Sequence, residues 1–196
     1  TFSYLSTYKY VPWRAKNIIE DTPVVGHNLV RNGGFSNGVD QWGFWEINYS
    51  NRDGALYTHL NTSSLNGGSV YQDLNYALES NFPMELSLSL GNISATDKVF
   101  SISLHSTDTW NGALGCSFTV PANTDFKNYR LVAKVPARWS NARFEFAIAT
   151  ADGQPSLIVD NINVQYRPDL NPTTIECTVQ DTPPAYNIII DHYVTG

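Results

Sequence analysis

Apolar and polar residues alternate with a period of two through the middle of this chain. Because successive side chains of a β-strand point to opposite faces, such alternation predicts strands with one buried face. Pairs that favour tight turns, such as Asn37-Gly38 and Asp53-Gly54, separate the alternating segments. The apolar positions of the clearest segments are Met84, Leu86, Leu88 and Leu90; Phe100, Ile102 and Leu104; and Phe144, Phe146 and Ile148.

Strands that recur at this spacing, without a convincing amphipathic helix, are typical of two packed antiparallel sheets. We therefore predict an all-β fold, a two-sheet antiparallel jelly-roll sandwich over residues 28–166. The side chains predicted to be buried in it are Trp42, Leu86, Leu88, Phe100, Ile102, Phe144 and Phe146.

Two further segments flank the predicted sandwich. Residues 1–27 are aromatic and irregular, and residues 167–196 contain four prolines and end in a short apolar run at 188–190. We interpret them as extended N- and C-terminal arms. Apolar arms of this kind can add a strand to a partner or insert side chains into it. Both arms, and residues 186–194 in particular, are therefore predicted to contact other copies or subunits of an assembly.

The charge of the chain narrows its partners. The net charge is −6, whereas proteins that bind nucleic acid need a basic surface to displace counterions. No run of about 18 apolar residues occurs, so we expect no membrane insertion.

Residues 1–13 lack the basic start, apolar core and cleavage site of a secretory signal, so either a signal has been removed or none was present.

The sequence contains no recognisable catalytic constellation. There is no nucleophile elbow, P-loop or dinucleotide-binding glycine motif. Carboxylates are numerous enough that a glycosidase pair is not excluded by counting, but such chemistry usually needs a larger scaffold with a deep cleft. The chain is therefore interpreted as non-catalytic. Its histidines, which show no metal-ligand spacing, are His27, His59, His105 and His192.

The two cysteines leave two possibilities open. Cys116 and Cys177 could form one disulfide, but they lie in different parts of the chain. Free cysteine is commonly a buried, small apolar residue. We therefore favour two buried free thiols.

Two motifs narrow the prediction to a family. Asn28-Leu-Val-Arg-Asn-Gly-Gly-Phe35, followed by Gly38 and Trp42, resembles the opening of carbohydrate-binding modules of the family 4 and 9 type. Leu157-Ile-Val-Asp-Asn-Ile-Asn-Val164 resembles their closing strand, and residues 69–74 and 129–133 resemble two strands between. The resemblance covers residues 28–166 and implies a galactose-binding-like jelly roll whose concave face binds sugars.

The resemblance also implies binding residues. Trp45 and Trp110 occupy positions where such modules carry the aromatic rings on which sugars stack, with Gln72 and Glu145 as hydrogen-bonding partners on the same face. The alternative is that both tryptophans cover the ends of the sandwich, as large aromatic residues often do. Trp42 is assigned to the core.

A structural Ca²⁺ is a further implication of the resemblance. The matching positions are the carbonyls of Gly34 and Gly54 and the carboxylate of Asp160, an oxygen-only set that suits a hard cation. Ser36 stands where many members of the family carry an acidic residue, which removes one charge from the site. Asp160 could instead bind only the amides of its turn.

Two functions fit such a domain, because the fold does not fix the function. The favoured hypothesis is a structural or adhesion protein of a large assembly. An example is a decoration protein of a bacteriophage head or tail, at the virion surface, with a glycan-binding-like domain. The alternative is an extracellular protein, either the carbohydrate-binding accessory module of a secreted polysaccharide-degrading enzyme or a cell-surface adhesin. In the alternative the partner is a polysaccharide, whereas in the assembly hypothesis the domain either grips host glycans or only cements subunits.

Overall fold

The computed structural model describes residues 23–60, 67–109, 112–149 and 157–181. These residues form eleven strands and no helix, and therefore no helix that could cross a membrane. The strands are β1 (Gly43–Trp45), β2 (Ile47–Arg52), β3 (Ala55–Leu60), β4 (Gly68–Asp73), β5 (Pro83–Asn92), β6 (Lys98–Ser106), β7 (Leu114–Val120), β8 (Thr124–Lys134), β9 (Ala142–Ile148), β10 (Leu157–Tyr166) and β11 (Glu176–Gln180).

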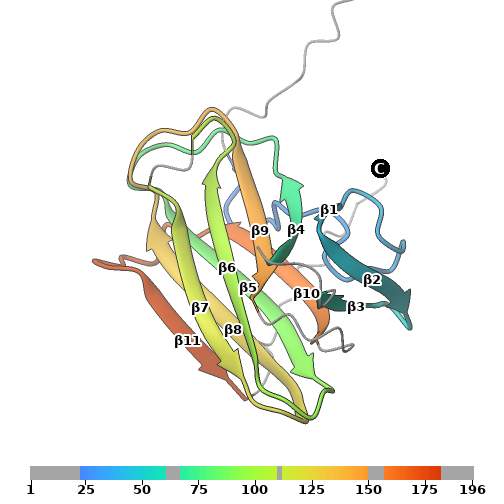
Figure 1. The fold of residues 1–196 in the computed structure, drawn as a ribbon. Helices are drawn as coiled ribbons and strands as arrows, with labels where there is room; N and C mark the ends of the chain where they lie inside the picture. Colours follow the sequence, from blue (N-terminus) through green and yellow to red (C-terminus); the bar gives the residue numbers. More distant parts are fainter. Residues whose placement is uncertain (1–22, 61–66, 110–111, 150–156, 182–196) are drawn as a thin grey trace, which may run out of the picture.

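The strands pack as two antiparallel layers, which confirms the predicted jelly-roll sandwich (Figure 1). One sheet has five strands in the order β1-β4-β9-β6-β7, and the other has six in the order β11-β8-β5-β10-β3-β2. Apolar side chains from both inner faces fill the space between the layers. The seven side chains predicted to be buried are all at most 8% exposed.

The opening motif is bound to the second half of β10. The side chain of Asn28 donates to the carbonyl of Ile162 at 2.9 Å and accepts from the amides of Val30 and Val164 at 3.0 and 2.9 Å. A Cβ on Gly33 would lie 2.1 Å from the carbonyl oxygen of Ile162, so only glycine allows this approach. The two motifs of the sequence are therefore one packed unit.

A tight hairpin joins β2 to β3. Arg52 pairs with Ala55, and the two residues between them, Asp53 and Gly54, have φ values of 52° and 77°. Positive φ at both central positions is the geometry of a type I′ turn, which Asp-Gly favours. The predicted turn at Asp53-Gly54 is thus confirmed.

The prediction of free thiols was wrong. Cys116 on β7 and Cys177 on β11 form a disulfide, with Cα atoms 5.9 Å apart and a sequence separation of 61. β7 and β11 are the edge strands of different sheets and lie along the same margin of the sandwich (Figure 1). The bond therefore joins the two layers at that margin.

The described part of the segment 167–196 contains β11, which extends the six-stranded sheet. β11 pairs with β8 from Glu176 to Gln180, and all five of its residues are exposed. Residues 1–22, most of the predicted N-terminal arm, and residues 182–196, half of the predicted C-terminal arm, lie outside the described residues. The limits of the arms therefore stay a prediction.

Candidate functional site

The outward-pointing residues of the five-stranded sheet form a polar face, here called the Trp45 face. Cross-strand pairing aligns them in rows that run across the sheet. With strands about 4.8 Å apart, a row across five strands is about 19 Å long. One row is Trp45, Ser69, Ala147, Ser101 and Ser117, and the next is Gly43, Tyr71, Glu145, Ser103 and Gly115.

Trp45 stands at one end of the first row. Its side chain is 48% exposed, although tryptophan is one of the residues that burial stabilises most. The rest of the row has only the small side chains of serine and alanine: Ser69, next to the indole, is 4% exposed, and Ala147, Ser101 and Ser117 beyond it are half-buried or exposed. A large exposed aromatic ring beside small side chains is a suitable platform for a flat ligand.

Tyr71 and Arg143 form a rigid pair in the neighbouring part of the face. The Tyr71 ring lies against β1, where a Cβ on Gly43 would be only 2.4 Å from it. The guanidinium carbon of Arg143 lies 4.4 Å from the ring centroid, close enough for a cation–π contact. Arg143 also donates to both carboxylate oxygens of Asp73, at 2.6 and 3.1 Å, and this hydrogen bonding raises its pKa. The orientation of the guanidinium is therefore fixed.

Glu145 lies at the centre of the face and is held by two neighbours. Its carboxylate is 3.3 Å from Nε2 of His105, and hydrogen bonds from His105 and then Ser69 lower its pKa against the opposing effect of burial. Nδ1 of His105 is 2.9 Å from the carbonyl of Ser106, which can only accept, so Nδ1 carries a proton. Nε2, the other ring nitrogen, faces the carboxylate of Glu145. The carboxylate is thus ionised and oriented, with further acceptor capacity.

The expectation that Gln72 shares this face was wrong. Gln72 follows Tyr71 on β4 and points to the other side of the sheet, where it is 2% exposed. Its amide accepts from the backbone N–H of Arg31 at 2.7 Å and donates to the Arg31 carbonyl at 2.9 Å. Gln72 therefore holds the opening segment in place. The structure brings Trp45 and Glu145 to one face, and Trp110 lies outside the described residues.

The three positions expected to bind Ca²⁺ do come together. A Cβ on Gly34 would lie 3.7 Å from Oδ1 of Asp160, and a Cβ on Gly54 would lie 3.9 Å from the carbonyl oxygen of Gly34. Asp160 accepts from the backbone and side-chain nitrogens of Asn161, at 2.7 and 3.2 Å. Burial raises the pKa of Asp160, so a cation beside it would offset the cost of its charge.

The chemistry of this cluster fits a hard cation, since its donors are carbonyl and carboxylate oxygens. Within the described ranges, no group of three or more His, Cys, Asp or Glu residues could hold a metal.

Tyr71, Arg143 and His105 belong to the Trp45 face but were not among the residues expected from the sequence. The sequence does contain a signal for them. Each lies an even number of positions from Glu145, or from a residue paired with Glu145 on a neighbouring strand, and therefore points to the same face. The burial of Val70 and Phe146 fixes that parity for β4 and β9. Alternation alone would have placed Tyr71, rather than Gln72, on the outward face.

The fold is similar to that of several solved structures. The enzymatically active domain of tailspike protein 4 from bacteriophage CBA120 matches with a TM-score of 0.52 and 16% identity, over 71% of this chain and 21% of that one. A family 4 carbohydrate-binding module matches with a TM-score of 0.51 and 15% identity, over 70% and 99%. A family 61 module, solved in complex with β-1,4-galactotriose, gives 0.51 and 8%, over 72% and 99%.

These similarities show the fold, a jelly roll of the kind found in carbohydrate-binding modules. The chain spans about a fifth of the tailspike domain that it matches. No protein-family profile matches the sequence, and no curated protein is similar enough in sequence to count as a relative.

Proposed function

We propose that this chain is a non-catalytic glycan-binding domain whose ligand lies across the Trp45 face. The observation that carries the proposal is the half-exposed Trp45 at the end of a row of serine and alanine. The apolar C–H face of a sugar ring can stack on the indole, and the row gives a chain of sugars room to continue across the sheet. The similarity of the fold to carbohydrate-binding modules supports the same function.

Polar groups beside the row supply the hydrogen bonds that a sugar requires. Glu145 accepts from hydroxyl groups, and Arg143 donates to them, while His105 and Asp73 keep both side chains in position. Fixed donors and acceptors lose little conformational entropy when a ligand binds, which favours affinity. The charged groups here are paired with each other, so the proposed ligand is a neutral polysaccharide.

A structural Ca²⁺ is part of the proposal. The Gly34 and Gly54 carbonyls and the Asp160 carboxylate would hold it, next to the type I′ turn and the opening segment. When bound, such an ion would tie the β2–β3 turn to β10. It lies away from the Trp45 face and would stabilise the fold without contacting sugar.

Glycan arrays test the proposal. We expect wild-type protein to bind one class of neutral polysaccharide and Trp45→Ala to bind it about 30-fold more weakly, equivalent to about 2 kcal/mol. Phe126→Ala is the matched control, because Phe126 is also exposed, at 41%, but lies on the other sheet. Equal loss of binding in both variants, or unfolding of Trp45→Ala, would contradict the proposed site.

We further propose that the domain works within a large assembly, as in a bacteriophage head or tail, where it would decorate the virion surface. The exposed strand β11 favours this function. Its outer edge is unpaired within the described sheet; Val179 in the strand is 49% exposed, and Ile175 immediately before it is 44% exposed. An apolar edge strand is a surface on which a neighbouring subunit can add a strand. The alternative remains an accessory module of a secreted polysaccharide-degrading enzyme, or an adhesin.

Deletion of residues 1–13 distinguishes these two proposals. In an assembly, the shortened protein should lose its association with other subunits in size-exclusion chromatography while its melting temperature stays unchanged. Val179→Lys should weaken the same association through β11. If neither change alters the association state and both variants retain glycan binding, the accessory-module hypothesis is the better one.

A further inference from the structure

The sheet opposite the Trp45 face carries polar side chains without hydrogen-bond partners. Ser87, Ser89, Asn128 and Asn163 point outward from β5, β8 and β10, and each is at most 8% exposed. Ser87 pairs across the strands with Asn163, and Ser89 with Asn128, so the four lie together. The atoms without a partner are Ser89 Oγ, both amide atoms of Asn128, and Asn163 Oδ1.

Such atoms call for an explanation, because about nine in ten buried polar groups in folded proteins have a partner. The charged side chains nearby do not serve as hydrogen-bond partners for these atoms. Glu85 accepts from Arg130 at 2.7 Å and also from Arg167, and Arg167 bonds Asp169 at 2.8 Å. These ions satisfy each other and leave the central amides and hydroxyls unpaired.

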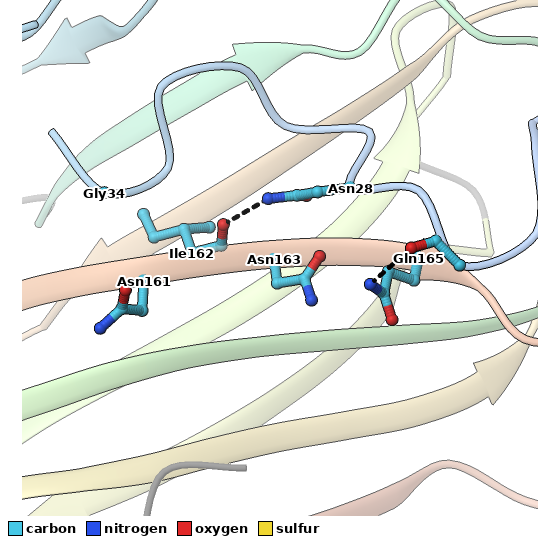
Figure 2. Close-up of a pocket in the computed structure, with 7 residues that line it drawn as sticks. Asn28, Gly34, Asn161, Ile162, Asn163 and Gln165 are labelled. Carbon is cyan, nitrogen blue, oxygen red and sulfur yellow. Dashed lines mark hydrogen bonds between the residues drawn. The ribbon is translucent and has the colours of Figure 1, made fainter. Parts of the chain in front are cut away.

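A pocket of about 290 Å³ opens beside Asn163, between β10 and the segment that carries Asn28 and Gly34 (Figure 2). Asn163 lies on β10 between Asn161 and Gln165, facing the segment that runs from Asn28 to Gly34 (Figure 2). More than nine-tenths of its surface is buried, and its Oδ1 has no partner. The residues that line the pocket in the described part of the chain are Gly26, Asn28, Gly34, Asn161, Ile162, Asn163 and Gln165.

The side chains that line the pocket determine which class of ligand it can bind. Its polar side chains are all carboxamides, and three of them already donate one hydrogen bond: Asn28 to Ile162, Gln165 to the carbonyl of Gly26 at 3.1 Å, and Asn161 to Asp160 at 3.2 Å. Carboxamides supply donors and acceptors side by side, which matches neighbouring hydroxyl groups that are donors and acceptors themselves. Because none of these lining residues is charged, a charged ligand would lose its hydration without an opposite charge in return.

We infer that this pocket binds a single neutral sugar unit or a polyol of similar size. A hydroxyl of the ligand donates to Oδ1 of Asn163, and the exposed amide of Asn161 and the rim amide of Gln165 bind its neighbouring hydroxyls. The site lies on the opposite sheet from the Trp45 face and is independent of it. Asp160 lies beside Gly34 and not in the lining, so the inference needs no metal ion.

The test is a titration of the full-length chain, labelled with ¹⁵N, with D-glucose, D-galactose, D-mannose and D-xylose. At least one sugar should shift the side-chain amide signals of Asn161, Asn163 and Gln165 in a saturable way. The shifts should be the same in Trp45→Ala, which separates this site from the proposed glycan face. In Asn163→Leu, saturable shifts of the Asn161 and Gln165 signals should be lost.

Asn161→Ala repeats the test at an exposed position, in case the buried substitution disturbs folding, and should weaken binding several-fold. The inference is overturned if no sugar gives saturable shifts, if the shifts persist in Asn163→Leu, or if Trp45→Ala removes them. It is also overturned if deletion of residues 1–13 shifts the Asn163 signals without sugar, because the chain's own arm would then be the occupant.

Discussion

Removing the disulfide should affect the strand β11 and the whole domain differently. The Cys116–Cys177 bond closes a loop of 61 residues. In the chain-entropy description, opening such a loop raises the entropy of the unfolded chain and lowers the free energy of unfolding by about 4 kcal/mol. For a domain of this size, that corresponds to a fall of about 10 °C in melting temperature.

The structure predicts that β11 separates first. Its five residues are exposed, and it is held by its ladder with β8 and by the bond to β7. A single edge ladder with little apolar burial is weak. In the variant Cys116→Ala/Cys177→Ala, the amides of residues 176–180 should therefore exchange with solvent well before those of β8.

The assay combines thermal unfolding, followed by circular dichroism, with hydrogen exchange followed by NMR. Reduced wild-type protein is the matched control, because it keeps both sulfur atoms and loses only the bond. If the variant melts at the wild-type temperature and residues 176–180 stay as protected as those of β5, the structural role assigned to this disulfide is wrong.

Three further predictions follow from single sites. Hydrogen bonds from His105 and Ser69 lower the pKa of Glu145 below its ordinary value of 4.5, so its carboxylate stabilises the fold above that pH. The stability difference between wild type and Glu145→Gln, measured by urea unfolding, should vanish as the pH falls through the lowered pKa; a constant difference would contradict this. Ca²⁺ at about 100 times its Kd should stabilise wild type by about 2.7 kcal/mol and leave Asp160→Asn unaffected in thermal shift, whereas an equal shift in both would exclude this site. Gly33→Ala should cost about 1–3 kcal/mol in the same assay, because the new Cβ meets a backbone oxygen, whereas Gly115→Ala, with ordinary contacts, should cost little.

The sandwich could be predicted from the sequence because its core follows the strand period. Leu86, Leu88, Phe144 and Phe146 are all fully buried, as their alternation with polar residues required. The turn at Asp53-Gly54 was equally accessible, since few dipeptides suit two successive positive φ values. Both features depend on residues that are close in sequence.

The disulfide could not be predicted, because it depends on two strands that are distant in sequence. Cys116 and Cys177 meet only because the edge strands of the two sheets lie along the same margin. Spacing along the chain does not report which edges coincide. The sequence also did not show which residues of β10 point outward, because an irregularity between Asp160 and Asn163 interrupts the alternation.

The candidate site was predictable in part. Trp45 and Glu145 lie on one face, but Gln72 was placed there although it follows Tyr71 on the same strand. Two consecutive residues of a strand cannot share a face, so the buried Gln72 leaves the outward position to Tyr71. The sequence predicted the correct strand. Which of its residues reaches the surface is decided by which of the adjacent residues are buried.

Chemical-shift mapping would show whether a polysaccharide binds across the Trp45 face. The ¹⁵N-labelled full-length protein is titrated with the best ligand from the glycan array, and the shifted amides are located on the two sheets. The largest shifts should fall on β1, β4, β9 and β6, around Trp45, Tyr71 and Glu145. Shifts confined to the six-stranded sheet, or to residues outside both sheets, would contradict it.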